Sequence, residues 1–290
     1  MTPGSFLTSW RFDPVPLALV VVTGTLYLAG ARRVWRSRGR ASFPPSRAGF
    51  FFAGLGVVLL ALESPVHTYA DRLLSVHMAQ HLLLTMVAPP LLLLGTPARL
   101  ALQASSRSAR RSLLLPVLHG PVGRVLGWPM LGWVLYAGVM WGTHLSPVYE
   151  ASVRSDGIHT LEHVVYLGAA LLFWFPVVGL DPSRRRLSHP GRLLYLFLSM
   201  PVTAVLGLSI YSADHVLYPS YISSTRLLGL SALSDQHLAG ALMWEGGMLV
   251  MVVALGAVLF DWLDREERVA EREDARRARE VVAGPSPRGA

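Results

Sequence analysis

The chain has 290 residues, of which 52% are hydrophobic and only 15% are charged, and its mean hydropathy is +0.43. Soluble domains carry roughly 25% charged residues, so this composition excludes an ordinary soluble domain and predicts an all-α, polytopic membrane protein. In a soluble protein the net charge of +8 would indicate nucleic-acid binding. Here the basic residues are all arginines in short loops between apolar runs, so the expected partner is the lipid bilayer and not nucleic acid. The absence of cysteine excludes disulfides and thiolate metal sites.

Runs of about 20 apolar residues predict the membrane spans. The segment before the first run holds Arg11 and Asp13 and lacks the positive region of a cleaved signal peptide, so the first span is expected to be retained. Prolines such as Pro89 and Pro129 predict kinks whose freed carbonyls bond to neighbouring helices. Together, residues 1–263 are expected to form a seven-helix transmembrane bundle. The predicted spans are approximately 14–31, 48–63, 73–95, 125–144, 158–179, 193–213 and 237–262.

The arginines predict the orientation of these spans, because positive residues are retained on the cytoplasmic side. Segments 32–47, 97–124, 181–192 and the tail after 263 hold six, five, four and seven arginines, which is 22 of the 26. These segments alternate along the chain with segments that hold few arginines. The N-terminus is therefore predicted to be outside and the C-terminus cytoplasmic.

The last residues, 264–290, are predicted to be a charged cytoplasmic tail. Residues 264–280 carry both charge signs and are expected to extend the seventh helix as a solvated helix. The final segment, GPSPRGA, has the composition of a disordered terminus.

Eight of the ten histidines fall on the predicted outer side. His77 and His81 lie in the first turns of the third span, and His159 and His163 open the fifth. Side chains four apart on a helix point within roughly 40° of each other, so each pair can serve one centre. Single histidines can instead bond across a helix interface. Two spaced pairs at the same membrane level as His144 and His237 favour a shared metal site.

The ligand types limit which metals the site would bind. Imidazole suits copper, zinc, iron and nickel, and a thioether such as that of Met78 adds a preference for monovalent copper. Glu245, roughly 12 Å into the seventh span, is interpreted as a proton or metal partner or as an interhelical hydrogen-bonding group. The polar residues that could orient the imidazoles are Gln80, Glu162, Asp235, Gln236 and Glu245.

Enzyme motifs are missing from the sequence. The pairs read HMAQH and HTLEH, so neither has the His-Glu-x-x-His order of a zinc peptidase. There is no Gly-x-Ser-x-Gly nucleophile elbow and no phosphate-binding glycine loop. The protein is therefore expected not to be an enzyme.

Four segments stand in order along residues 50–263: HMAQHLLLTMVAPPLLLLG (77–95), MWGTHLSPVYEAS (140–152), IHTLEHVVYLGAALLFWFPVVG (158–179) and DQHLAGALMWEGG (235–247). Together they resemble the bacterial CtaG family, polytopic membrane assembly factors for caa3-type cytochrome c oxidase. The resemblance implies a multi-pass protein of the bacterial cell membrane that helps to mature the oxidase and has no turnover of its own. It implies copper as the metal, oxidase subunits as partners and an external copper chaperone as a further partner.

The motif positions carry specific residues over from the family. The expected ligands are His77, His81, His159 and His163, with His144 or His237 in an exchangeable position. This sequence departs from the family at His237, where a second glutamine is common, and at Glu245, where a neutral residue precedes a proline. The other matched positions are Met78, Tyr149, Glu162, Asp235, Gln236 and Trp244.

Two alternatives remain open at the level of sequence. Histidines on different helices could hold haem in an electron-transfer protein, which a strong Soret band would reveal. Glu245 and the histidines could instead relay protons or metal ions in a transporter, which metal flux into proteoliposomes would reveal. The sequence shows no inverted repeat of the kind that many transporters carry.

Overall fold

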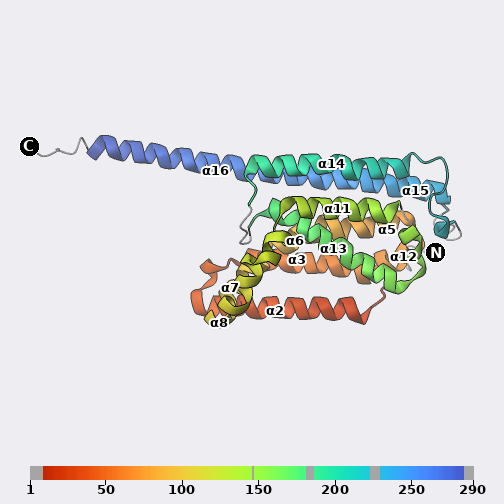
Figure 1. Cartoon of the computed structure of the whole chain (residues 1–290), viewed down its shortest axis with the longest axis horizontal. Helices are drawn as coiled ribbons and strands as arrows, with labels where there is room; N and C mark the ends of the chain where they lie inside the picture. The colour runs from red at the N-terminus through yellow and green to blue at the C-terminus, as the bar shows by residue number, and fades with distance from the viewer. Residues whose placement is uncertain (1–8, 146, 181–185, 223–228, 284–290) are drawn as a thin grey trace, which may run out of the picture.

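The computed structural model describes residues 9–145, 147–180, 186–222 and 229–283, and these residues form helices and connecting turns without a strand (Figure 1). The longest helices are α2 (Pro14–Arg38), α3 (Pro45–Glu63), α13 (Asp156–Val178), α14 (His189–Tyr211) and α16 (Gly247–Ala283). The shorter helices are α4 (Pro65–Ala70), α5 (Leu74–Leu82), α6 (Ala88–Leu94), α7 (Pro97–Ala104), α8 (Arg107–Ala109), α9 (Leu115–His119), α10 (Pro121–Leu126), α11 (Pro129–His144), α12 (Pro147–Arg154) and α15 (Ala232–Ala241). Wider π-helical turns form η2 (Leu83–Val87), η3 (Arg110–Leu114) and η6 (Leu242–Gly246), and 3₁₀ turns form η1 (Arg40–Ser42) and η4 (Pro219–Tyr221).

Among the described residues, six helical stretches are long and apolar enough to cross a membrane. This confirms the prediction of an all-α, multi-pass membrane protein. The stretches are Pro14–Arg38, Pro45–Ala70, Leu74–Ala104, Gly157–Val178, His189–Tyr211 and Ala232–Arg279.

The fourth predicted span, 125–144, is shorter than expected. Its helix, α11, has 16 residues and begins at Pro129, which lacks a backbone N–H and therefore suits a first helical turn. The preceding residues form the separate helix α10, so Pro129 starts a helix where the sequence predicted a kink within one. At 1.5 Å per residue α11 measures about 24 Å, less than the roughly 30 Å of a bilayer core. The seventh crossing and the orientation stay predictions.

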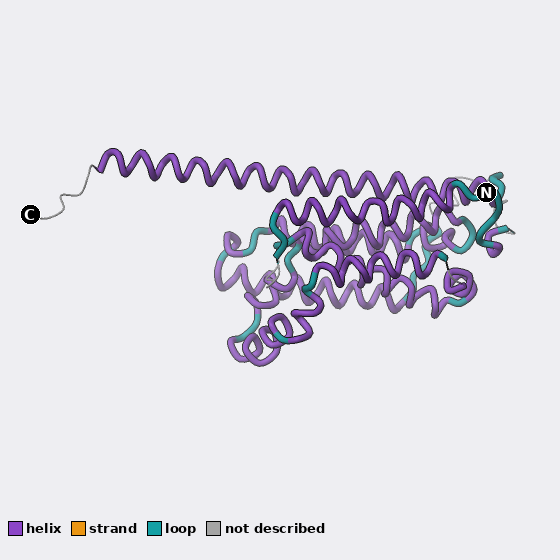
Figure 2. Tube along the Cα trace, turned by 45° about the horizontal axis from the view of Figure 1, so that its top comes forward, coloured by secondary structure: helices purple, strands orange, loops and turns teal. Residues whose placement is uncertain are grey.

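The long helices run side by side as one bundle, with α16 projecting beyond it (Figures 1 and 2). One hydrophobic core joins α5, α11, α13, α14 and α16, and a second joins α2, α3, α6 and α7. Large apolar side chains also cover the outside, including Leu26 at 69% and Val253 at 64% exposure. Exposed aliphatic surface of this kind suits contact with lipid tails.

A proline pair shapes the third spanning stretch, in which α5, η2 and α6 are continuous. Pro89 has no N–H to donate, so the carbonyl of Thr85, four residues earlier, loses its usual helical partner. The buried indole of Trp174 on α13 donates to this carbonyl instead, at 2.9 Å. The expectation that a neighbouring helix satisfies a carbonyl freed by proline is therefore confirmed at this position.

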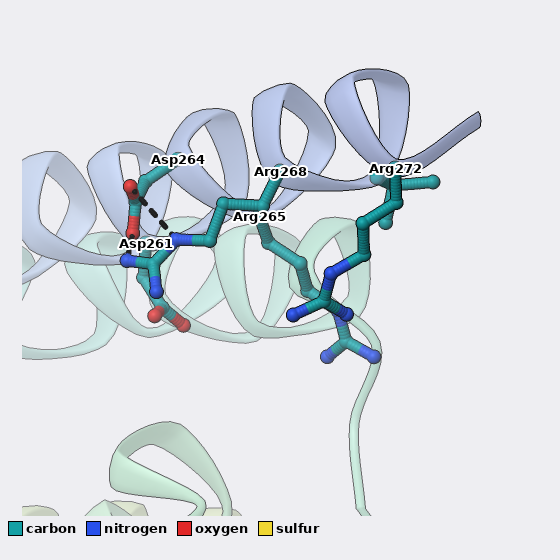
Figure 3. Close-up of a pocket in the computed structure, with 6 residues that line it drawn as sticks. Asp261, Asp264, Arg265, Arg268 and Arg272 are labelled. Carbon is teal, nitrogen blue, oxygen red and sulfur yellow. Dashed lines mark hydrogen bonds and ion pairs between the residues drawn. The ribbon is translucent and has the colours of Figure 1, made fainter. Parts of the chain in front are cut away.

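The last helix continues without a break from the bundle to Ala283, which confirms the expected helical extension through residues 264–280. Figure 3 shows Arg265, Arg268 and Arg272 along this extension, with Arg268 paired to Asp264 one turn before it. The predicted disordered end, residues 284–290, lies outside the described residues. In Figure 1 the arginine-rich α7–α8 segment lies at the same end of the bundle as the α16 extension, and α5, α12 and α15 lie at the other.

Candidate metal centre

At the α5, α12 and α15 end of the bundle, four helices bring six histidines together. We call this group the histidine cluster. His77 and His81 lie with ring centroids 4.3 Å apart, as do His159 and His163, and the two pairs meet where the rings of His77 and His159 stack at 5.2 Å. The members are His67 on α4, His77 and His81 on α5, His144 on α11, and His159 and His163 on α13.

The remaining contacts close the cluster around His81. Its ring lies 5.8 Å from His144 and 6.4 Å from His163, while His67 lies 5.8 Å from His159. Except for half-buried His67, every member is at most 7% exposed. The structure thus brings together the two predicted pairs and His144 inside the protein, where a polar group needs a partner.

Three side chains of this group have the geometry of a metal site. Ligand atoms of His77, His159 and Glu162 all lie within 4.8 Å of one another, and all three residues are buried. Both carboxylate oxygens of Glu162 lack a hydrogen-bond partner in the described part of the chain. Glu162 was predicted to orient an imidazole, but its position suits direct coordination.

A tyrosine determines which nitrogen of His77 faces the cluster. The Tyr221 hydroxyl donates to the carbonyl of Ala70 at 3.1 Å, and it lies 3.0 Å from Nδ1 of His77. Because its one proton is used, the hydroxyl oxygen must accept a proton from Nδ1. The lone pair of His77 therefore lies on Nε2, which is 2.9 Å from Nε2 of His81 and accepts its proton. A hydrogen bond of this kind fixes the tautomer of a metal-binding histidine.

Several other nitrogens of the cluster lack a hydrogen-bond partner in the part of the chain that the structure describes. Nδ1 of His144 lies 2.7 Å from the carbonyl of Met140, which can only accept, so its lone pair is on Nε2. Within the described residues, that Nε2, Nε2 of His163 and Nδ1 of His81 are buried without a hydrogen bond. An unsatisfied buried polar group costs about 1–3 kcal/mol, which coordination of a metal ion would remove. The donor set therefore fits a metal.

Asp235 holds the start of α5, the helix that carries His77 and His81. Its carboxylate accepts from the backbone N–H of Leu74 at 2.7 Å and of Ser75 at 3.3 Å, and from the Ser75 hydroxyl. No side chain of α5 itself caps this end. The carboxylate on α15 therefore acts as the cap, since a helix N-terminus presents unpaired N–H groups and favours negative charge. Asp235 thus fixes the helix that carries His77 and His81.

Gln236 holds the loop that carries Tyr221 through hydrogen bonds to its backbone. Its side-chain oxygen accepts from the N–H of Leu217 at 2.7 Å, and its nitrogen donates to the carbonyl of His215 at 3.0 Å. Gln80 is also a fixing residue: it donates to the carbonyl of Ala61 and to Nδ1 of His67, at 2.8 and 3.2 Å.

Two predicted residues lie elsewhere. His237 is half-buried, and its Nε2 lies 3.2 Å from the carbonyl of Ala213, to which it must donate. It follows Asp235 by two residues, about 200° around the helix, so it faces away from the side that contacts α5. Glu245 is exposed on the outside of η6. The structure gives neither residue a place in the histidine cluster.

Sequence reasoning missed one member of the cluster, His67, and two tyrosines that surround it, Tyr166 and Tyr221. Tyr166 stacks on His81 at 4.4 Å and follows His163 by three residues, a helical spacing that could have revealed it. His67 and Tyr221 carried no such signal, because they lie outside the helices that hold the histidine pairs. Burial raises the pKa of Tyr149 and Tyr221 above that of an ordinary tyrosine, so both phenols stay protonated.

The sequence profile of the family described as "Cytochrome c oxidase caa3 assembly factor" matches residues 25–265. The chain belongs to this family. The profile extends over the whole histidine cluster, including the residues of α4, α5, α11 and α13 that form it. The resemblance seen in the four sequence motifs is thus confirmed, and the family supports a multi-pass protein of the bacterial cell membrane.

Three curated relatives of this caa3 assembly factor family member are mycobacterial. An uncharacterized protein of Mycobacterium leprae is 31% identical over 276 residues, which are 93% of this chain and 42% of that protein. Uncharacterized proteins of Mycobacterium bovis and Mycobacterium tuberculosis are each 32% identical over 275 residues, 92% of this chain and 41% of theirs. The chain therefore spans about two fifths of the length of these relatives. No solved structure matches it.

Replacing Tyr221 with phenylalanine is expected to weaken metal binding about 10- to 100-fold, the usual effect of losing a group that orients a ligand. The ring would still fill its site, but Nδ1 of His77 would lose the oxygen that accepts its proton. Competition titration with a chelator measures the change. Tyr211→Phe is the matched control, because Tyr211 is 44% exposed and lies beside His237. Equal affinities for Tyr221→Phe and the parent would contradict the assigned tautomer.

Proposed function

We propose that this protein binds copper at the histidine cluster and assists its delivery to the catalytic subunit of cytochrome c oxidase, without catalytic turnover. The observation that carries the proposal is the approach of His77, His159 and Glu162 to within 4.8 Å of one another, in a buried group. His81, His144 and His163 lie next to them and offer further nitrogens. Family membership supports the role in oxidase assembly.

The donor set favours a divalent ion at this position. Two imidazoles and one carboxylate suit copper(II), zinc or iron(II). Copper is preferred among these because the proposed client is an oxidase whose assembly the family serves. Further histidines surround His77, His159 and Glu162. This arrangement suits a cargo ion, because one ligand can replace another without the metal leaving the protein.

The partners follow from the same proposal. Oxidase subunits receive the metal, and an external copper chaperone supplies it from the predicted outer side. His67 is the half-buried member of the cluster and therefore the one nearest to an entering ion.

The two alternatives gain no support from the geometry. The axial ligands of a haem iron lie on opposite faces of the porphyrin, whereas the rings of His77 and His159, which lie on different helices, stack directly on each other with centroids 5.2 Å apart. A proton or metal relay through Glu245 would need contact with the cluster, but Glu245 is exposed on the outside of η6.

Elemental analysis of the purified protein, beside its optical spectrum and an oxidase assay in cells lacking the gene, tests the proposal. We expect about one copper bound at the histidine cluster, no Soret band, and low oxidase activity that added copper partly restores. Binding of zinc or iron in place of copper, or full oxidase activity in the deletion strain, would overturn copper delivery. A Soret band would instead establish the haem alternative.

A further inference from the structure

A second group of metal-binding side chains borders a small internal cavity next to His81. The cavity has a volume of about 10 Å³, close to that of one water-sized sphere. Its lining residues include four methionines, Met78, Met86, Met140 and Met243, together with His81. The whole chain has nine methionines, so nearly half of them meet at this one cavity. We call it the methionine cavity.

The methionines reach the cavity from three helical stretches, because α5 and η2 are continuous. Met78 lies on α5, Met86 on η2, Met140 on α11 and Met243 on η6, and each is at most 4% exposed. Two of these segments are π-helical turns within membrane-spanning stretches. Such turns alter the register of the side chains that follow and occur frequently at functional sites. Helical spacing places Met78 and Met86 on one face of their stretch, but only the approach of α11 and η6 brings Met140 and Met243 to the same cavity.

The chemistry of this lining differs from that of the histidine cluster. The cavity has no carboxylate among its lining residues, whereas Glu162 belongs to the group of the cluster that could hold a metal. Thioethers are soft ligands that select copper(I), and an uncharged set suits a single positive charge better than a double one. Burying an ion is costly unless ligands replace its water, which four sulfurs and an imidazole can do.

His81 links the two sites. Its Nε2 donates to His77 in the cluster, and its ring borders the methionine cavity. Its Nδ1 carries a lone pair and, within the described residues, is buried without a hydrogen-bond partner. His81 can therefore contact the histidine cluster through Nε2 and offer Nδ1 to a metal in the methionine cavity.

Methionine also fills irregular gaps in a core, so packing alone is the alternative explanation for the four methionines at this cavity. Two other buried methionines of the same core, Met200 and Met251, provide a comparison. Neither borders this cavity. Substituting these two residues with leucine is therefore a control in the same core but away from the cavity.

We infer that the methionine cavity is a second metal site, which holds copper(I) through thioethers and His81 beside the histidine cluster. Its place in copper delivery rests on the function proposed above, but the binding itself does not. A soft site adjoining the cluster would keep the ion inside the protein when it is monovalent.

The test is an anaerobic titration of the full-length protein with copper(I) alone, followed by X-ray absorption at the copper edge. We expect sulfur scattering from the bound ion, and we expect it to persist in a His77→Ala/His159→Ala variant. In Met78→Leu/Met243→Leu, the affinity for copper(I) is expected to fall at least tenfold and the sulfur scattering to disappear, while binding of copper(II) at the cluster is retained. The control Met200→Leu/Met251→Leu is expected to match the parent.

Copper(I) bound only through nitrogen and oxygen in the parent protein would overturn the second site without relying on any variant. Unchanged sulfur scattering in Met78→Leu/Met243→Leu would also overturn it. Thermal unfolding of each variant checks that leucine preserves the fold, as expected for a swap of similar volume. If the parent binds copper(I) through sulfur but no copper at the histidine cluster, the proposed function fails and the methionine site stands.

Discussion

Replacing His77 and His159 together with alanine is expected to weaken copper(II) binding at the histidine cluster by more than about a hundredfold. Loss of a group that merely orients a ligand already costs 10- to 100-fold, and this variant removes two of the three residues proposed to hold the metal. Because the two residues sit on α5 and α13, the change also removes the ring contact at which the two histidine pairs meet. Titration of the purified protein with copper(II) measures the loss directly.

The same variant is expected to leave cells without active oxidase when it replaces the native protein. His237→Ala is the matched control: it removes a histidine from the same end of the bundle whose Nε2 bonds to a loop carbonyl outside the cluster. We expect this control to retain copper and oxidase activity. Unchanged copper(II) affinity in His77→Ala/His159→Ala would exclude the cluster as the metal site, and full oxidase activity would exclude its role in delivery.

The second large effect is expected from Asp235→Ala, although Asp235 is not a proposed ligand. Its removal leaves the N–H groups of Leu74 and Ser75 buried without their acceptor, which should lower the free energy of unfolding by about 3 kcal/mol. The first turn of α5 would loosen, and His77 lies in the turn that follows. We therefore expect weaker metal binding together with a lower melting temperature.

Asp235→Asn separates the hydrogen bonds of Asp235 from its negative charge. Its side-chain oxygen can still accept one backbone N–H, but the negative charge at the helix N-terminus is lost. We expect its stability and its metal affinity to lie between those of the parent and Asp235→Ala. If Asp235→Ala unfolds at the parent's temperature, measured by circular dichroism in detergent, capping from α15 is not what fixes α5.

Several features could be predicted from the sequence because their cause is local. The pairing of His77 with His81, and of His159 with His163, follows from the helical period alone. Apolar run length predicted the spanning stretches, and mixed charge predicted the continuation of α16. Where the length of a helix depended on a proline, as at the start of α11, the prediction was wrong by several residues.

Other features depend on which helices become neighbours. Apolar faces of membrane helices resemble one another in sequence, so helical spacing does not reveal that α15 packs on α5 or that α4 lies beside α13. Predictions for His237 and Glu245 relied on their membrane level, whereas their direction around the helix removed them from the cluster. Glu162 could be placed on the histidine face of α13, but not within reach of His77.

The sequence by itself determined a multi-pass helical membrane protein with two histidine pairs, because composition and helical period act over a few residues. Only the tertiary structure decided that the pairs share one buried centre with Glu162, and that Tyr221 and Asp235 hold it in place. The hydrogen bonds of these two residues join atoms 144 to 161 positions apart in the chain. Such contacts arise from the packing of whole helices, which no short segment encodes.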